Sequence, residues 1–477
     1  MCQSPLGRAL ALVATVGLLV VACATPEIPV VTAPATQTPI PVPTATPVPT
    51  VADQPTPTPA PSEGEPGLSA DEIRIGVIFD AGVDPVSDQV SASAAEAVEA
   101  WAASINVEAG GLAGRAVVVE RIPTSPLLAD HAEAIDLACN RDLFALVGST
   151  ALFDDLGLEQ LQSSGCALPD FPSTVTTPQR LESSVTTVSN PITSDTYLAG
   201  WARYYADSRA QAAARSATML LEFPASVVSG ERLIEAAEAQ GLEFVYRPQV
   251  AFDTDFVAEV EELAATRSRL LAWPNDGGRM IDLLAELDAQ GVVLNTIDCA
   301  QACYSRSWVQ AAGELGNGVA VWLPTRPLEE ADLSPELTRY LFWLGTANLA
   351  SEATSVGVSA WASALLFQEA VNLAVGVDTA DYDPATLTRA GVVRAASTID
   401  EWDARGLHGV SNPAAGTPSP CFVLMTLNDG AWDRTFPQRR GKFNCAPENL
   451  VPLTITTQLG SEDPVPTPEN EDGESDG

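Results

Sequence analysis

The stretch Asn-Val-Glu-Ala-Gly-Gly-Leu-Ala-Gly-Arg, residues 106–115, decides how the chain is interpreted. It follows an alanine-rich segment with helical periodicity, 91–106, and precedes an apolar run at 117–122 of the kind that forms a strand. Glycines such as Gly110 and Gly111 can end a helix and adopt the positive φ angles of a tight turn. The stretch therefore predicts a helix, a turn and a strand in immediate succession.

The same alternation continues on both sides of this stretch. Strand-like runs lie at 73–79, 117–122, 144–147, 217–221, 270–273, 293–297 and 319–323, and helix-like segments at 91–106, 129–139, 153–163, 195–210, 229–240, 256–265 and 278–290. Strands that alternate with helices predict parallel sheets covered by helices. The part of the chain that can form a folded core is too long for one such sheet and fits two domains of roughly 200 residues each. We therefore expect an α/β fold.

The N-terminus has a pattern typical of export. One basic residue, Arg8, precedes an apolar run that is shorter than the roughly 20 residues needed to span a bilayer. The run ends in Val20-Val21-Ala22-Cys23, which resembles the lipobox of bacterial lipoproteins, where the cysteine accepts lipid. That resemblance implies a signal peptide over 1–22 and an anchor at Cys23 on the outer face of the cell membrane. Ordinary signal cleavage beside an incidental cysteine is the alternative.

Two further segments have compositions that cannot form a core. Residues 23–66 are rich in Pro and Thr without an apolar period, which predicts an extended, disordered tether. A glycosylated stalk is the alternative. Residues 461–477 are acidic and contain no aromatic residue, which predicts a disordered tail.

Charge and composition exclude several classes of function. The 477 residues include 62 acidic and 24 basic side chains, a formal net charge of −38 at pH 7, whereas nucleic acid binding needs a basic surface. His131, His408 and Lys442 leave little for acid–base, metal or Schiff-base chemistry, and we expect both histidines at the surface. Gly-x-Ser-x-Gly, His-Glu-x-x-His and Walker A sequences are absent. We expect no enzyme, catalytic residue, cofactor or metal.

The remaining cysteines predict disulfides. Apart from Cys2 and Cys23, the cysteines are Cys139, Cys166, Cys299, Cys303, Cys421 and Cys445. An even number outside the cytoplasm favours disulfides, and their grouping along the chain suggests the pairs 139–166, 299–303 and 421–445. A metal or redox site at 299–303 is the alternative, although three intervening residues and the lack of a nearby histidine speak against it.

The order of these motifs resembles a known family. An apolar run at 73–79, the turn at 106–115 and a strand ending in Val147-Gly148-Ser149 recur in this order in type I periplasmic binding proteins of the branched-chain amino acid class, the solute receptors of ABC importers. The resemblance covers roughly residues 72–376. It implies two Rossmann-like lobes with parallel sheets, joined by a hinge. It also implies a monomer that hands a small solute, an amino acid, amide or similar molecule, to an ABC permease.

This fold sets the expected domains. The N-terminal lobe would comprise 67–191 and a return segment at 326–380, and the second lobe would comprise 192–325. Residues 381–460 would complete the lobes and add a disulfide-bearing segment longer than the minimal fold needs. That length keeps open a non-transport ligand sensor or cell-envelope interaction protein on the same fold. A lipoprotein hydrolase is a more distant alternative.

The resemblance also names candidate ligand contacts at the carboxyl ends of strands. At the strand end that carries Ser149 and Thr150, and in the loop 174–176, a ligand carboxylate would bind to Ser149 and Thr176 and an ammonium to the carbonyl of Thr174. A role as helix caps and turn residues is the alternative. In the second lobe, loops after strands would place 222–223, 273–276 and 298 near the cleft. The candidate contacts there are Phe223, Trp273 and Asp298, where Asp298 would pair with an ammonium and the aromatic residues would pack against the ligand. The first loop, 80–85, departs from the family pattern, so aromatic acids, urea-like molecules and peptides remain alternatives.

Overall fold

The computed structural model describes residues 64–126, 130–191, 195–222, 224–346 and 353–454. The predicted signal peptide, Cys23, nearly all of the predicted tether and the predicted acidic tail lie outside these residues.

The N-terminal lobe is built on a four-stranded parallel sheet with strand order β2-β1-β3-β4. Its strands are β1 (Glu72–Asp80), β2 (Ala116–Thr124), β3 (Ala145–Val147) and β4 (Asp170–Phe171). Successive side chains of a strand point to opposite faces. Ile75 and Val77 of β1 therefore pack in one core cluster, and Ile78 packs in another on the opposite face. Burial on both faces explains why this strand appears in the sequence as a continuous apolar run.

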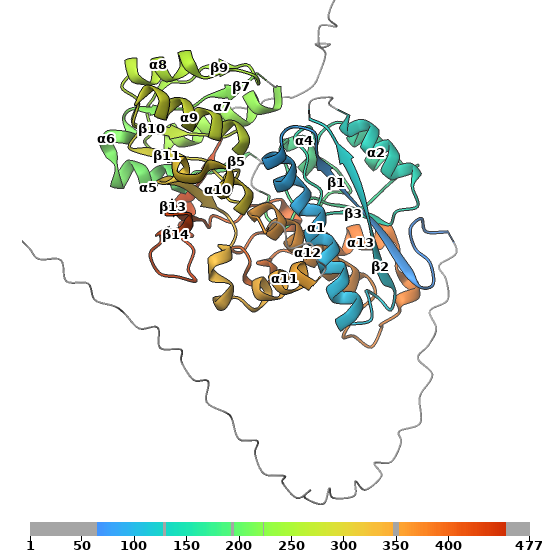
Figure 1. Ribbon diagram of the computed structural model, residues 1–477. Coiled ribbons are helices and arrows are strands. Elements are labelled where there is room, and N and C mark those ends of the chain that lie inside the picture. Colours follow the sequence, from blue (N-terminus) through green and yellow to red (C-terminus); the bar gives the residue numbers. More distant parts are fainter. Residues whose placement is uncertain (1–63, 127–129, 192–194, 223, 347–352, 455–477) are drawn as a thin grey trace, which may run out of the picture. The chain divides into compact units, whose positions relative to one another are not determined.

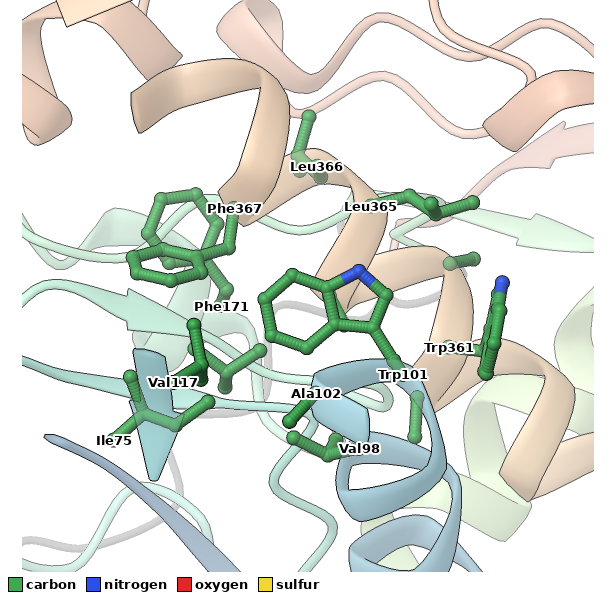
Figure 2. Packing of buried hydrophobic residues seen from close by; sticks show 14 of the residues in the cluster. Ile75, Val98, Trp101, Ala102, Val117, Phe171, Trp361, Leu365, Leu366 and Phe367 are labelled. Atoms are coloured by element: carbon green, nitrogen blue, oxygen red, sulfur yellow. The ribbon is translucent and has the colours of Figure 1, made fainter. Parts of the chain in front are cut away.

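Helices cover both faces of this sheet (Figure 1). One face is covered by α1 (Pro85–Glu108) and α12 (Ser355–Ala374), the other by α2 (His131–Asn140) and α3 (Leu158–Gln162). The rings of Trp101 from α1 and Phe171 from β4 lie around Phe367 of α12, at centroid distances of 6.2 and 5.4 Å (Figure 2). The chain thus returns to the N-terminal sheet after it has formed the second lobe.

Specific residues determine where α1 begins and how the chain turns after it. Asp84 caps the start of α1 by accepting hydrogen bonds from the backbone N–H groups of Val86 and Ser87, at 2.8 and 3.1 Å. Gly111 has a φ of +102°, and a Cβ at this position would lie 1.9 Å from the carbonyl oxygen of Arg115. Only glycine fits there. The predicted succession of helix, turn and strand at residues 91–122 is confirmed.

The second lobe contains a seven-stranded sheet with strand order β14-β13-β12-β11-β10-β6-β8. Its strands are β6 (Ser216–Ala217), β8 (Phe244–Tyr246), β10 (Leu270–Ala272), β11 (Thr296–Asp298), β12 (Val319–Leu323), β13 (Val423–Asn428) and β14 (Ala431–Phe436). The pairs from β8 to β12 are parallel, and β13 and β14 add an antiparallel hairpin beside β12. The α/β architecture with parallel sheets agrees with the predicted fold class.

Helices also cover both faces of the second sheet. On one face lie α8 (Val257–Ala265), α9 (Gly277–Gln290) and α10 (Arg306–Ala312), and on the other α5 (Gly200–Ser208), α6 (Ala210–Ala213) and α7 (Pro224–Ala239). The other helices are α4 (Pro178–Glu182), α11 (Pro335–Thr346) and α13 (Arg389–Ala396), with 3-10 turns at Gly313–Gly316, Leu328–Leu333, Pro384–Thr386, Ala404–Gly406, Pro413–Ala415 and Pro447–Asn449.

Four predicted segments differ from the structure. The helix expected at 153–163 is shortened to α3, which begins at Leu158. The run 217–221 is divided between β6 and β7 (Leu220–Leu221), and β7 pairs with β9 (Gln249–Val250) in a separate sheet. The strand expected at 293–297 begins later, at Thr296. The helix expected at 195–210 starts as β5 (Thr196–Leu198), which pairs with β15 (Leu450–Pro452). A strand partner about 250 residues away leaves no signal in the local pattern.

The three disulfides pair as the grouping of the cysteines predicted. The Cα–Cα distances are 5.2 Å for Cys139–Cys166, 5.8 Å for Cys299–Cys303 and 4.0 Å for Cys421–Cys445. Across the described ranges, no set of three or more His, Cys, Asp or Glu side chains is arranged to hold a metal ion. Within the same ranges, no helix combines the length and apolar character needed to cross a membrane.

Candidate binding site

A cavity of about 210 Å³ lies where strands of both lobes end. From the N-terminal lobe it is lined by Asp80, the last residue of β1, and by Leu152, which follows β3. From the second lobe it is lined by Leu221, the last residue of β7, by Phe252 after β9, and by Asp276 after β10. Ligands of open α/β sheets bind beyond the carboxyl ends of the strands. This cavity is therefore the candidate site.

Asp80 contributes an acidic group from the N-terminal lobe. Its Oδ2 accepts a hydrogen bond of 2.7 Å from the backbone N–H of Leu152. Burial raises the pKa of Asp80 to about 7, and the charges of Asp130, Asp154 and Asp88 act in the same direction. The Leu152 hydrogen bond opposes this shift and only partly offsets it.

Asp276 contributes an acidic group from the second lobe. It caps α9, since its Oδ1 accepts a hydrogen bond of 2.8 Å from the backbone N–H of Arg279. Its Oδ2 is buried and has no hydrogen-bond partner. Burial is the main reason that the pKa of Asp276 is raised to about 6, and the nearby charge of Asp84 acts in the same direction, whereas the backbone hydrogen bond and the charge of Arg279 oppose it. One oxygen of this carboxyl group is therefore held by the fold, and the other is left for a donor.

The rest of the wall combines apolar side chains with hydroxyl groups. Leu152, Leu221 and Phe252 supply apolar surface. The other lining residues are Val83, Ser87, Ser91, Pro126, Ser226, Ser229, Pro274 and Asn275. Asn275 is fixed, because its Nδ2 donates to the carbonyl of Met219 at 2.8 Å. Among the described residues that line the cavity, none is Lys or Arg.

The predicted contacts of the N-terminal lobe do not line this cavity. Ser149 is only 2% exposed, and its Oγ accepts a hydrogen bond of 3.1 Å from the backbone N–H of Ile78. The hydroxyls of Thr150 and Thr174 bond to each other at 2.8 Å. Thr174 lines a separate small hollow.

Thr176 serves the fold in the same way. Its backbone N–H donates to Asp154 Oδ2 at 2.7 Å, and its hydroxyl donates to the carbonyl of Ala151 at 3.0 Å. The hydroxyls for which we predicted ligand contacts thus tie two loops of the N-terminal lobe to each other. The structure brings these residues together, but they are not among the residues that line the cavity.

The predicted contacts of the second lobe are also internal. Trp273 is 1% exposed, packs edge-on against Phe256 at a centroid distance of 6.0 Å, and donates from Nε1 to the carbonyl of Asp276. Asp298 is buried and accepts a hydrogen bond of 2.7 Å from the hydroxyl of Tyr205, and burial raises its pKa to about 7. Trp273 is therefore a core residue, and Asp298 has a partner within the lobe. Phe223 lies outside the described residues.

Comparison with known proteins identifies the chain. The sequence profile of the periplasmic binding protein family matches residues 72–431. The chain belongs to the periplasmic binding protein family. No curated protein sequence matches it significantly. The resemblance on which the sequence analysis relied is thus confirmed.

Solved structures of periplasmic binding proteins share the fold. A fatty acid ABC transporter substrate-binding protein from Thermomonospora curvata has a TM-score of 0.64 at 18% identity, covering 81% of this chain and 95% of its own. A branched-chain amino acid ABC transporter protein from Thermus thermophilus with bound valine has a TM-score of 0.62 at 14% identity, covering 80% and 98%. A solute-binding protein from R. palustris in complex with benzoate has a TM-score of 0.59 at 15% identity, covering 76% and 94%.

Membership assigns this periplasmic binding protein a coarse function. It is an extracytoplasmic, non-enzymatic solute-binding protein. The predictions of its family and of a non-enzymatic role are therefore confirmed.

Both histidines of this periplasmic binding protein are buried, so the prediction that they lie at the surface is wrong. His131 Nδ1 lies 2.7 Å from the carbonyl oxygen of Leu156, and burial together with the charge of Arg180 lowers its pKa to about 3. His408 Nε2 lies 2.9 Å from Ser189 Oγ, and burial lowers its pKa to about 4. Each histidine packs against partners that are distant in sequence, and its local context gave no sign of them.

Both acidic residues of the cavity follow predicted strands in the sequence. Asp80 begins the loop 80–85, which departs from the family pattern, and Asp276 lies in the loop 273–276, which is expected near the cleft. The rule that ligands bind at the carboxyl ends of strands places Asp276 there and applies equally to Asp80. Neither residue is among the predicted ligand contacts.

Proposed function

We propose that this chain is a lipid-anchored receptor that binds a small solute in the cavity between Asp80 and Asp276 and delivers it to an ABC importer. The observation that carries the proposal is that the cavity is lined by strand ends from both lobes. Closure of two lobes on a solute by a hinge motion would enclose it and present a closed form to a permease. We propose that the receptor acts as a monomer.

The anchor would be the lipidated thiol of Cys23. The apolar run before Val20-Val21-Ala22-Cys23 supports this proposal, and residues 23–66 would act as a tether between the lipid and the body. Incorporation of radiolabelled palmitate into the expressed protein tests it. We expect the wild-type protein to be labelled and to fractionate with membranes. Equal labelling of a Cys23→Ala variant would contradict lipidation at this residue.

Solute binding is tested by thermal unfolding of the full mature protein in detergent against amines, amino acids, amides and small acids. A solute that binds only the folded state raises Tm in a concentration-dependent manner. Phe252→Ala, in the cavity wall, should weaken binding of that solute at least tenfold. Phe342→Ala is the matched control, because Phe342 is 62% exposed on α11 and does not line the cavity. If no solute of any class raises Tm, the proposed receptor function is wrong.

A further inference from the structure

The composition of the cavity restricts the class of solute, an inference that rests on the proposed function. We infer that the solute is a small organic cation, an amine or amidine with a compact apolar body, whose charged group lies between Asp80 and Asp276. The inference follows from the carboxyl group that each lobe contributes, the apolar wall between them and the lack of a basic side chain among the described lining residues.

The carboxyl group of Asp80 has only acidic neighbours. The charged groups that act on it are Asp88, Asp130 and Asp154. Each of these three is held by the fold. Asp88 accepts from the backbone N–H of Val83, Asp130 from that of Ser125, and Asp154 from those of Thr176 and Thr177. The three carboxyl groups therefore stay in place around Asp80 and repel its negative charge. A cation beside Asp80 would offset this repulsion.

Asp276 presents an unpaired oxygen. Its Oδ2 is buried without a partner, which is unfavourable for a carboxyl group until a donor reaches it. The basic group nearest in sequence, Arg279, lowers the pKa of Asp276 through its charge but donates no hydrogen bond to Oδ2. Its guanidinium donates to Asp282 and to the carbonyl of Thr254, and lies 4.7 Å from the ring centroid of Phe256. Arg279 does not line the cavity, so an ammonium N–H of the solute is the donor that fits Oδ2.

The same wall disfavours an anion. A ligand carboxylate in this cavity would face Asp80 and Asp276 without a cation to balance it. The hydroxyls that the family resemblance assigned to a carboxylate are those of Ser149 and Thr176, and neither residue lines the cavity. A lone acid, or an amino acid bound through its carboxylate, therefore has no anchor among the described lining residues.

The size of the cavity limits the apolar part of the solute. Pockets for drug-sized ligands measure roughly 300–1,000 Å³, whereas this cavity measures about 210 Å³. Leu152, Leu221 and Phe252 would cover one compact hydrocarbon or aromatic group. A long-chain lipid or a peptide does not fit this space.

The test compares ligands of one shape and different charge. Benzylamine, benzyl alcohol and benzoate are titrated into the full mature protein at pH 8 by calorimetry, with putrescine and agmatine as further cations and valine as a zwitterion. We expect at least one of the cations to bind. We expect benzylamine to bind at least tenfold more tightly than benzyl alcohol and benzoate to bind most weakly.

Variants locate the charge recognition. Asp276→Asn should weaken binding of the cation at least tenfold, and Asp80→Asn with Asp276→Asn should abolish it. Asparagine is itself a good helix cap, so the N-terminus of α9 is retained. Asp288→Asn is the control, because Asp288 is exposed at the other end of the same helix. Far-ultraviolet circular dichroism shows whether each variant is folded.

The pH dependence gives an independent readout. Burial raises the pKa of Asp80 to about 7 and the pKa of Asp276 to about 6. The charged groups that act on Asp80 are Asp88, Asp130 and Asp154, and those that act on Asp276 are Asp84 and Arg279. Affinity for a cation should therefore rise at least tenfold between pH 5 and pH 8, and affinity for an anion should fall.

The outcomes separate the class of solute from the receptor function. Binding of benzoate or valine that is unchanged or tightened by Asp276→Asn overturns the cationic class, while the receptor function stands. Binding of a cation that neither aspartate affects also overturns it. Failure of every solute, whatever its charge, rejects the receptor function and this inference with it.

Discussion

The hydroxyl of Ser149 accepts a hydrogen bond of 3.1 Å from the backbone N–H of Ile78 and so joins the end of β3 to β1 inside the N-terminal lobe. We expect Ser149→Ala to leave this N–H unpaired and to lower the free energy of unfolding by about 1–3 kcal/mol. Urea unfolding measures the change. Ser397→Ala, on an exposed residue, is the control and should stay within about 0.5 kcal/mol. Equal effects of the two substitutions would contradict a structural role for the Ser149 hydroxyl.

The ionised carboxyl group of Asp276 should lower the free energy of unfolding of the solute-free protein at neutral pH. Its folded pKa of about 6 exceeds the ordinary value of 3.8, so the folded state holds the proton more tightly than the unfolded state. Stability therefore falls as pH rises from about 4 to about 6, and the cost persists in full above that range. We expect Asp276→Asn to raise the free energy of unfolding by about 1–2 kcal/mol at pH 8 and to change it little at pH 4. Urea titrations at both pH values measure the change, with Asp288→Asn as the control. An equal increase in the free energy of unfolding at pH 4 and pH 8 would contradict this account.

Arg180 and Asp170 form a buried ion pair of 2.8 Å beside the loop that carries Thr176. Removal of one partner leaves a buried charge uncompensated, so Arg180→Met should lower the free energy of unfolding by about 3–5 kcal/mol. Arg247→Met is the control, because the ion pair of Arg247 with Glu238 is exposed and contributes at most about 1 kcal/mol. Thermal unfolding compares the two variants. A mild effect of Arg180→Met would mean that the pair is dispensable.

Gly110 and Gly111 provide a matched pair of substitutions. Both have positive φ angles, +71° and +102°, but a Cβ at Gly110 meets nothing within 4 Å, whereas one at Gly111 would lie 1.9 Å from the carbonyl oxygen of Arg115. Gly110→Ala should lower the free energy of unfolding by about 1 kcal/mol, because alanine is disfavoured in the left-handed backbone conformation. Gly111→Ala should cost at least about 2 kcal/mol more, because the backbone must move. Urea unfolding of both variants gives the difference, and similar values would show that the turn can rearrange.

Features with a local cause could be predicted from the sequence. The run 73–79 is a strand because its side chains are buried on both faces, and the turn at 106–115 requires its glycines whatever surrounds it. The disulfides follow from the grouping of the cysteines. Features with a distant cause could not be predicted. The pairing of β5 with β15 and the burial of His131 beside Arg180 depend on contacts that no window of sequence contains.

The cavity lies where the sequence predicts a ligand, but its lining includes none of the described residues that were predicted as ligand contacts. The carboxyl ends of the strands were the expected place, and the cavity lies there. Which side chain at a strand end points into a cavity depends on the exact end of the strand. Trp273 follows β10 directly and turns into the core, whereas Asp276, three residues later, lines the cavity. A difference of three residues is within the error of boundaries drawn from sequence.

The return of the chain to each sheet determines when the lobes can form during export. The N-terminal core needs α12, which ends at Ala374, and the second sheet is completed by β13, which begins at Val423. Neither lobe can reach its final packing until most of the chain is available. The polypeptide therefore lacks a finished domain while its first half is being synthesised.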